Sequence, residues 1–242
     1  MSHPTPKHTV ATRSQWLAAR HQLWLHEKAF THQRDELAAA RRALPWVAVE
    51  QDYRFQGPDG DLSLGELFAG RSQLLVYHFM FADGWNEGCP GCSFLADHFD
   101  GANLHLAHHD VSLVAVSRAP YAEFQAFRRR MGWHFPWFSS HGSRFNKDFG
   151  VTVATDGSAQ YNYEPYTGDE TELPGLSAFY RDSDGSLYHT YSTYARGLDI
   201  LVNAYNFLDL APLGRNEDGT MDWVRHHDRY ENATDKPHCC KE

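Results

Sequence analysis

The four cysteines are the residues of this sequence best suited to chemistry, and they form two close pairs. Cys89 and Cys92 enclose Pro90 and a glycine, whereas Cys239 and Cys240 are adjacent near the end of the sequence. A secreted domain held by disulfides spreads its cysteines along the chain, while close pairs are typical of redox or metal chemistry. The first pair therefore predicts either thiol–disulfide exchange or a metal site.

The position of the first pair favours redox chemistry. The strongest predicted strand covers 73–81, and a helix is expected over 93–109. With Pro90 at the first helical position, Cys89 falls at the N-cap, where unpaired N–H groups and the helix dipole stabilise a thiolate. Cys92 lies one turn further along. We therefore predict that Cys89 is a nucleophile with a lowered pKa and that Cys92 resolves the mixed disulfide.

A metal site is the alternative, because half of a zinc site has the same cysteine spacing. In this interpretation copper or zinc is held by Cys89, Cys92 and a histidine from a remote loop, either His189 or His141. The redox interpretation requires no cofactor. It implies instead a thiol or disulfide substrate, or a reductant partner.

Three other residues are candidates for supporting roles around the pair. Trp85 lies shortly before Cys89, and Arg118 follows a predicted strand over 111–116 and offers a nearby cation. His78 lies inside the strongest strand, where it either lines the site or is a hydrogen-bonded core residue.

The second cysteine pair belongs to a possible tail site, His238-Cys239-Cys240. A vicinal pair in a polar terminal segment can relay electrons to the first pair, bind a soft metal ion, or be inert. We favour inert thiols, because adjacent cysteines near a mobile end need no function to be tolerated.

The predicted elements form a βαβ unit followed by a ββα unit, which is the thioredoxin arrangement. After the helix over 93–109 and the strand over 111–116, these elements are a helix over 121–131, an irregular aromatic stretch over 132–175, a hairpin of strands over 176–181 and 187–191, and a helix over 198–208. The fold class is therefore α/β, a thioredoxin-like fold with a central mixed sheet flanked by helices. The aromatic stretch is either a ligand-binding wall or a satellite core, and we favour the core.

A long helix is expected near the N-terminus, over 12–44, with Ser14 as its N-cap. Trp16 begins an apolar stripe that repeats every seven residues to Leu44. This stripe predicts packing on the parent domain or, as the alternative, the seam of a homodimer. The expected domains are a helical extension over 1–45, the thioredoxin-like domain over 46–212, and a polar tail over 213–242 that contributes little to the core.

The charge balance argues against two classes of partner. The 242 residues contain 22 Lys and Arg against 31 Asp and Glu, a formal net charge of -9. Proteins that bind nucleic acid or anionic membranes need a basic face. No apolar run is long enough to span a bilayer, and the polar N-terminus lacks the apolar core of a signal peptide. We therefore expect a cytoplasmic protein with neither nucleic acid nor a membrane as partner.

Several motifs together resemble one bacterial family. They are QLLVYHFMF followed by GCPGC, VSRAP, MGW, SSHGSRFNKDFG, PGLSAF, HTYSTYARG and LDLAPLGR. From about Leu25 to Arg215 the sequence is similar to a thioredoxin-like family described as predicted dithiol–disulfide oxidoreductases (domain of unknown function 899). The resemblance implies the fold and, through the cysteine pair, a redox enzyme.

Two positions depart from the pattern of thioredoxins. Gly88 stands directly before the first cysteine, where thioredoxins have a tryptophan. Thioredoxins also place a cis-proline opposite the cysteines, and the equivalent place falls near Ser177, so that Pro174 is displaced from this role. Without a cis-proline, metal binding at the pair is less hindered.

Overall fold

The computed structural model describes residues 8–153 and 159–230. The chain divides into two compact units, Met1–Pro45 and Trp46–Glu242. The first unit contains one long helix, α1 (Arg13–Arg42). Thr12 is its N-cap and forms a capping box with Gln15, so the prediction of Ser14 as the cap is wrong by two positions. No side chain of α1 is buried, and a homodimer through this helix stays a prediction.

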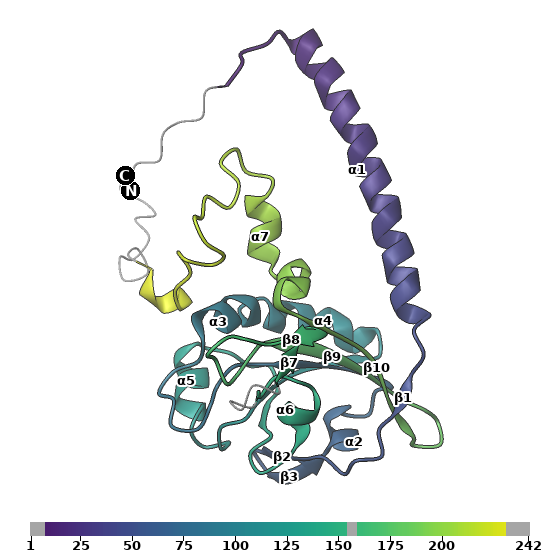
Figure 1. The fold of residues 1–242 in the computed structure, drawn as a ribbon, viewed down its shortest axis with the longest axis vertical. Helices are drawn as coiled ribbons and strands as arrows, with labels where there is room; N and C mark the ends of the chain where they lie inside the picture. The colour runs from purple at the N-terminus through teal and green to yellow at the C-terminus, as the bar shows by residue number, and fades with distance from the viewer. Residues whose placement is uncertain (1–7, 154–158, 231–242) are drawn as a thin grey trace, which may run out of the picture. The chain divides into compact units, whose positions relative to one another are not determined.

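The second unit contains an eight-stranded mixed sheet (Figure 1). Its central strand is β4 (Gln73–His78), which pairs in parallel with β5 (Val111–Ser117) and antiparallel with β9 (Gly175–Arg181). The order across the sheet is β1-β10-β9-β4-β5-β6-β2-β3. The remaining strands of this sheet are β1 (Val47–Ala48), β2 (Arg54–Gly57), β3 (Gly60–Ser63), β6 (Trp137–Ser139) and β10 (Leu187–Tyr194).

A second, two-stranded sheet pairs β7 (Gln160–Tyr161) with β8 (Glu164–Pro165). The helices of this unit are α2 (Leu64–Leu67), α3 (Pro90–Ala96), α4 (Phe99–His108), α5 (Gln125–Arg130), α6 (Phe145–Asp148) and α7 (Asn203–Leu208), with 3-10 helices η1 (Ala195–Leu201) and η2 (His227–Arg229). None of the helices within the described ranges has both the length and the apolar character needed to cross a membrane.

The connections confirm the thioredoxin-like fold. Strand β4 leads through α3 and α4 into the parallel strand β5, and the β9–β10 hairpin then leads into η1 and α7. Three strands were missed in the stretch expected to be irregular, and all of them are short: β6 joins β5 in parallel over three residues, and β7 and β8 have two residues each. The helix predicted over 93–109 is two helices, which meet at Asp97 and His98.

The two faces of the sheet carry separate apolar clusters. Alternate residues of β4 point to opposite faces, so Tyr77 belongs to the cluster with α3 and α5, whereas Val76 belongs to the cluster with α2 and α6. Part of the aromatic stretch is core, although it belongs to the two main clusters and not to the satellite core favoured from the sequence: Trp133, Phe135 and Trp137 are buried in the first cluster, and Phe145 in the second.

The C-terminal part of the chain contradicts the expectation of a polar tail that contributes little to the core. Val224 and His226 are each only 4% exposed, and Met221 and Trp223 pack against the first cluster. The apolar residues Met221, Trp223 and Val224 have no regular spacing in the sequence, so no helical or strand periodicity reveals them.

Gly88 lies where the loop after β4 crosses the aromatic core. A Cβ at this position would lie 2.5 Å from Cε1 of Phe79 and 2.8 Å from Cε1 of Phe127, both closer than carbon atoms pack. The tryptophan that thioredoxins carry before the first cysteine therefore has no room here, because even a methyl group would displace two buried rings.

Replacing Gly88 by alanine should lower the free energy of unfolding by about 1–3 kcal/mol through overpacking. Gly101→Ala is the matched control, since Gly101 lies within α4 with no atom inside 4 Å of its Cβ position. This control should raise stability by about 0.5–1 kcal/mol through helix propensity. Urea unfolding of both variants provides the measurement, and a Gly88→Ala protein as stable as the parent would contradict the packing argument.

Candidate active site

The first cysteine pair lies where β4 gives way to α3. Cys89 is the N-cap of α3 and Pro90 follows at the start of the helix, as the sequence predicts. The backbone holds this turn closely, since the Cys89 N–H donates to the Met80 carbonyl (3.3 Å) and the Cys89 carbonyl accepts from Ser93 (2.9 Å). Cys89 is half-buried and Cys92 is buried, and both thiols are free.

The surroundings of Cys89 favour its thiolate. A hydrogen bond from the Cys92 thiol is the largest influence, and it lowers the pKa of Cys89 to about 7 against the opposing effect of burial. The backbone N–H groups of Cys92 and Gly91 lower the pKa further. A large share of Cys89 is therefore ionised at neutral pH.

Cys92 has the opposite character. Burial raises its pKa well above the ordinary thiol value, and the negative charge on Cys89 adds to this effect. The hydroxyl of Tyr77, itself fully buried, donates a hydrogen bond to the Cys92 sulfur and opposes the shift. When the pair holds a single proton, this proton therefore resides on Cys92 and Cys89 carries the charge.

Two tyrosines near the pair were missed by sequence reasoning. Tyr77 contacts Cys92, and burial raises the pKa of Tyr161, with a smaller contribution from the nearby Cys92. The Tyr161 hydroxyl donates to the Pro174 carbonyl (2.6 Å) and accepts from the Ala195 N–H (3.0 Å). Strand alternation could have identified Tyr77, because it points to the cysteine face when its neighbour His78 does not.

His78 and Ser177 lie on the other face of the sheet, so their assignment to the site is wrong. Their side chains hydrogen-bond to each other at 2.8 Å, and the His78 ring packs against Phe145 and Phe149. Burial lowers the pKa of His78 to about 3, which keeps the ring neutral. Of the two interpretations of His78, the structure therefore supports the hydrogen-bonded core residue. Pro174, not Ser177, directly precedes β9, and the described residues contain no cis peptide bond.

The structure gives Arg118 and Trp85 other surroundings. Arg118 lies directly after β5, where its guanidinium forms an ion pair with the buried carboxylate of Glu172 (2.5 Å) and a longer one with Asp83 (3.6 Å). Its charge is therefore shared by two carboxylates and is not free for Cys89. Trp85 lies on the loop before the pair, packs beside Phe81 and is 37% exposed.

The structure does not bring the histidines of the metal hypothesis to the cysteine pair. His189 hydrogen-bonds to Ser192 (2.8 Å) and packs against the ring of Phe149, next to the second cluster. His141 lies 3.6 Å from the Asp83 carboxylate. Within residues 8–153 and 159–230, no group of three or more His, Cys, Asp or Glu side chains is placed to hold a metal ion. The tail site His238-Cys239-Cys240 lies outside the described residues.

Comparison with solved structures gives matches of low sequence identity. A peroxidoxin, BcpB of Mycobacterium tuberculosis, is 17% identical over 66% of this chain and 94% of that chain, with a TM-score of 0.46. The bacterioferritin comigratory protein of Xanthomonas campestris is 14% identical over 68% and 96%, with a TM-score of 0.43. A secreted disulfide oxidoreductase of M. tuberculosis is 15% identical over 63% and 92%, with a TM-score of 0.35.

Comparison of the sequence identifies the family. No curated protein matches the chain significantly. One family model, described as a bacterial protein of unknown function (DUF899), matches residues 5–230 and so includes the sheet, the cysteine pair and the C-terminal segment. The chain therefore belongs to the bacterial DUF899 family.

Proposed function

We propose that this protein is a thiol–disulfide oxidoreductase that uses Cys89 and Cys92. The observation that carries the proposal is the opposite tuning of the two thiols, one with a pKa lowered to about 7 and the other with a pKa raised by burial. Exchange requires a thiolate that attacks first and a second thiol that stays protonated until the mixed disulfide has formed.

The exchange consists of two displacements. The Cys89 thiolate attacks one sulfur of a substrate disulfide, forms a mixed disulfide and releases the other sulfur as a thiolate. Cys92 then gives up its proton and attacks the Cys89 sulfur, which releases the second substrate thiolate. The proton of Cys92 and one from solvent convert both leaving groups to thiols. The substrate gains two electrons, and the protein ends with a Cys89–Cys92 disulfide.

Tyr77 has a supporting part in the second displacement. Its hydroxyl donates to the Cys92 sulfur, and a donor at this place stabilises Cys92 as its negative charge develops. Because Tyr77 is fully buried in the aromatic core, its orientation is fixed before the reaction. We therefore assign it to positioning and stabilising the resolving thiol.

The pKa of Cys89 should depend on the hydrogen bond that Cys92 donates. Cys92→Ala removes this donor and should raise the pKa of Cys89 above its value in the parent protein, whereas Cys92→Ser keeps a donor and should raise it less. The rate of iodoacetamide alkylation against pH, followed at Cys89 by peptide mass spectrometry, measures the shift. Identical titrations of the two variants would show that the donor does not tune Cys89.

Trapping should separate the roles of the two cysteines. With Cys239 and Cys240 replaced by serine to remove the tail thiols, reduced protein should consume one equivalent of hydroxyethyl disulfide and end with Cys89 joined to Cys92. Adding Cys92→Ser should stop the reaction at a stable mixed disulfide on Cys89, since no resolving thiol remains. Cys89→Ser should abolish consumption, as followed by intact mass. Consumption unaffected by Cys89→Ser would exclude this pair from the mechanism.

A further inference from the structure

The segment Glu217–Tyr230, here called the strap, follows α7 and returns to the start of α3 (Figure 1). Its first residue, Glu217, joins three other residues. Oε2 of Glu217 accepts hydrogen bonds from the Tyr205 hydroxyl (2.9 Å), the Trp223 indole (3.0 Å) and the Met221 N–H (3.2 Å). The rings of Tyr205 and Trp223 both pack edge-on against Phe94 of α3. One end of the strap is thereby fixed to the helix that carries the cysteines.

Met221 of the strap covers the cysteine motif. Its sulfur lies 3.1 Å from the position that a Cβ on Gly91 would occupy, and the Cys89 sulfur lies 3.8 Å from the same position. The thioether and the Cys89 sulfur therefore both lie next to the same point at Gly91. Met221 also has a φ of 62°, a left-handed conformation that is unfavourable for a residue with a long side chain. The hydrogen bond of its N–H to Glu217 helps to hold this conformation.

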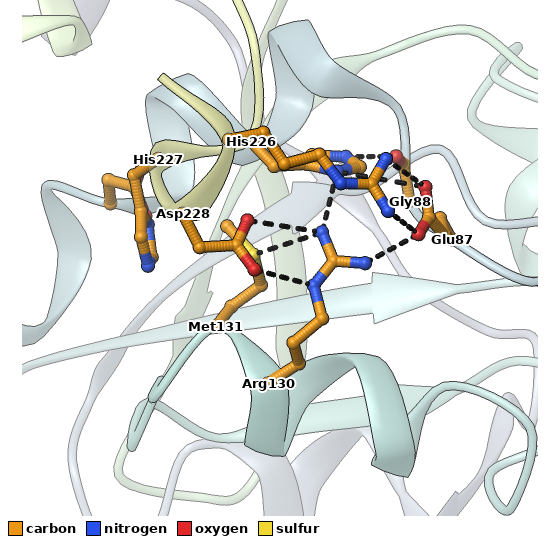
Figure 2. Close-up of polar contacts among 9 residues, drawn as sticks. Glu87, Gly88, Arg130, Met131, His226, His227 and Asp228 are labelled. Carbon is orange, nitrogen blue, oxygen red and sulfur yellow. Dashed lines mark hydrogen bonds and ion pairs between the residues drawn. The ribbon is translucent and has the colours of Figure 1, made fainter. Parts of the chain in front are cut away.

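The other end of the strap is fixed to the residues directly before Cys89, as Figure 2 shows. The Arg130 guanidinium lies between Glu87 (2.5 Å) and Asp228 of the strap (2.9 Å). Arg229 of the strap forms a second ion pair with Glu87.

His226 adds a buried hydrogen bond to this network (Figure 2). Arg130 lies 2.7 Å from Nδ1 of His226 and can only donate, so Nδ1 accepts and Nε2 carries the hydrogen. That Nε2–H donates to the Gly88 carbonyl at 2.8 Å. The strap is thus held both by charged groups and by a buried hydrogen bond, on the residues that set the position of Cys89.

We propose that the strap restricts the reaction at Cys89 to low-molecular-weight disulfides, with Met221 as the residue that limits access. This inference rests on the proposed exchange function and deepens it. A protein disulfide brings backbone on both sides of its sulfur atoms, and this backbone needs the surface beside Cys89 and Gly91 that Met221 occupies. A small flexible disulfide needs only an approach to the half-buried residue Cys89. A protein substrate must wait for the strap to open, which its anchors at both ends oppose.

Access to Cys89 can be measured without any assumption about turnover. Reduced full-length protein, with Cys239 and Cys240 replaced by serine, is alkylated with iodoacetamide and with iodoacetamide attached to a polyethylene glycol chain. Each rate is divided by the rate of the same reagent with glutathione. We expect the bulky reagent to be slower by about tenfold or more, because it reacts only with the minor open population.

Three variants assign this discrimination to the strap. Met221→Ala removes the cover, and Asp228→Asn weakens the anchor to Arg130, so either should bring the two normalised rates closer together. Arg225→Ala is the matched control, because among the described residues the guanidinium of this exposed strap residue bonds to carbonyls of the strap itself. It should leave the discrimination unchanged. Far-ultraviolet circular dichroism checks that each variant is folded, and Asp228→Asn keeps the test decisive if Met221→Ala does not fold.

The same proteins are then given hydroxyethyl disulfide or insulin as the disulfide. The parent should reduce hydroxyethyl disulfide much faster than insulin, and Met221→Ala should gain mainly on insulin. Equal normalised alkylation by both reagents in the parent, or discrimination unaffected by both strap variants, would overturn the strap inference and leave the exchange function standing. Discrimination in alkylation with no reduction of either disulfide would overturn the proposed function and the substrate class together.

Discussion

The site depends on one close approach, the passage of the backbone at Gly88 over two buried rings. Phe79 and Phe127 leave no room for a Cβ at this position. The chain is thereby held against the aromatic core one residue before Cys89, and the Cys89 N–H reaches the Met80 carbonyl. This contact determines where α3 starts, and therefore which cysteine is at the N-cap and which is buried one turn later.

Burial divides the work between the two cysteines. Both lie against the same apolar cluster, but Cys92 is inside it, while Cys89 is at its edge with N–H groups directed at its sulfur. Burial penalises the charge on Cys92 more than hydrogen bonds can offset, so a single negative charge settles on Cys89. The different depths of Cys89 and Cys92 in the aromatic core thus give two identical side chains different pKa values.

The loop before Cys89 is held from two sides. On one side Gly88 packs against the aromatic core. On the other side His226 of the strap donates a hydrogen bond to the Gly88 carbonyl, and Arg229 forms an ion pair with the neighbouring Glu87. The glutamate carries an exposed fraction of 34%, so its ion pairs are partly screened by water and individually weak. The buried hydrogen bond from His226 is shielded from solvent, which makes it the more durable of the two attachments.

The sequence by itself determined the elements whose signals are local. The apolar run over β4, the proline after Cys89 and the turn between β9 and β10 each specify structure within a few residues, and together they predict the thioredoxin-like order of elements and the N-cap cysteine. The alternation of side chains along β4 also predicts that they point to two opposite faces. This alternation identifies Tyr77 as a site residue only once the position of Cys92 is known.

Only the tertiary structure decided which distant residues meet. His226 lies 138 positions from the glycine whose carbonyl it binds, and Arg229 lies 142 positions from Glu87. His189 and His141 could have been partners of the cysteines by residue type, yet the fold places His189 against the opposite cluster and His141 beside Asp83. Residue type states what a side chain can do, but no local pattern records the distances across the fold, because these depend on how all the elements pack together.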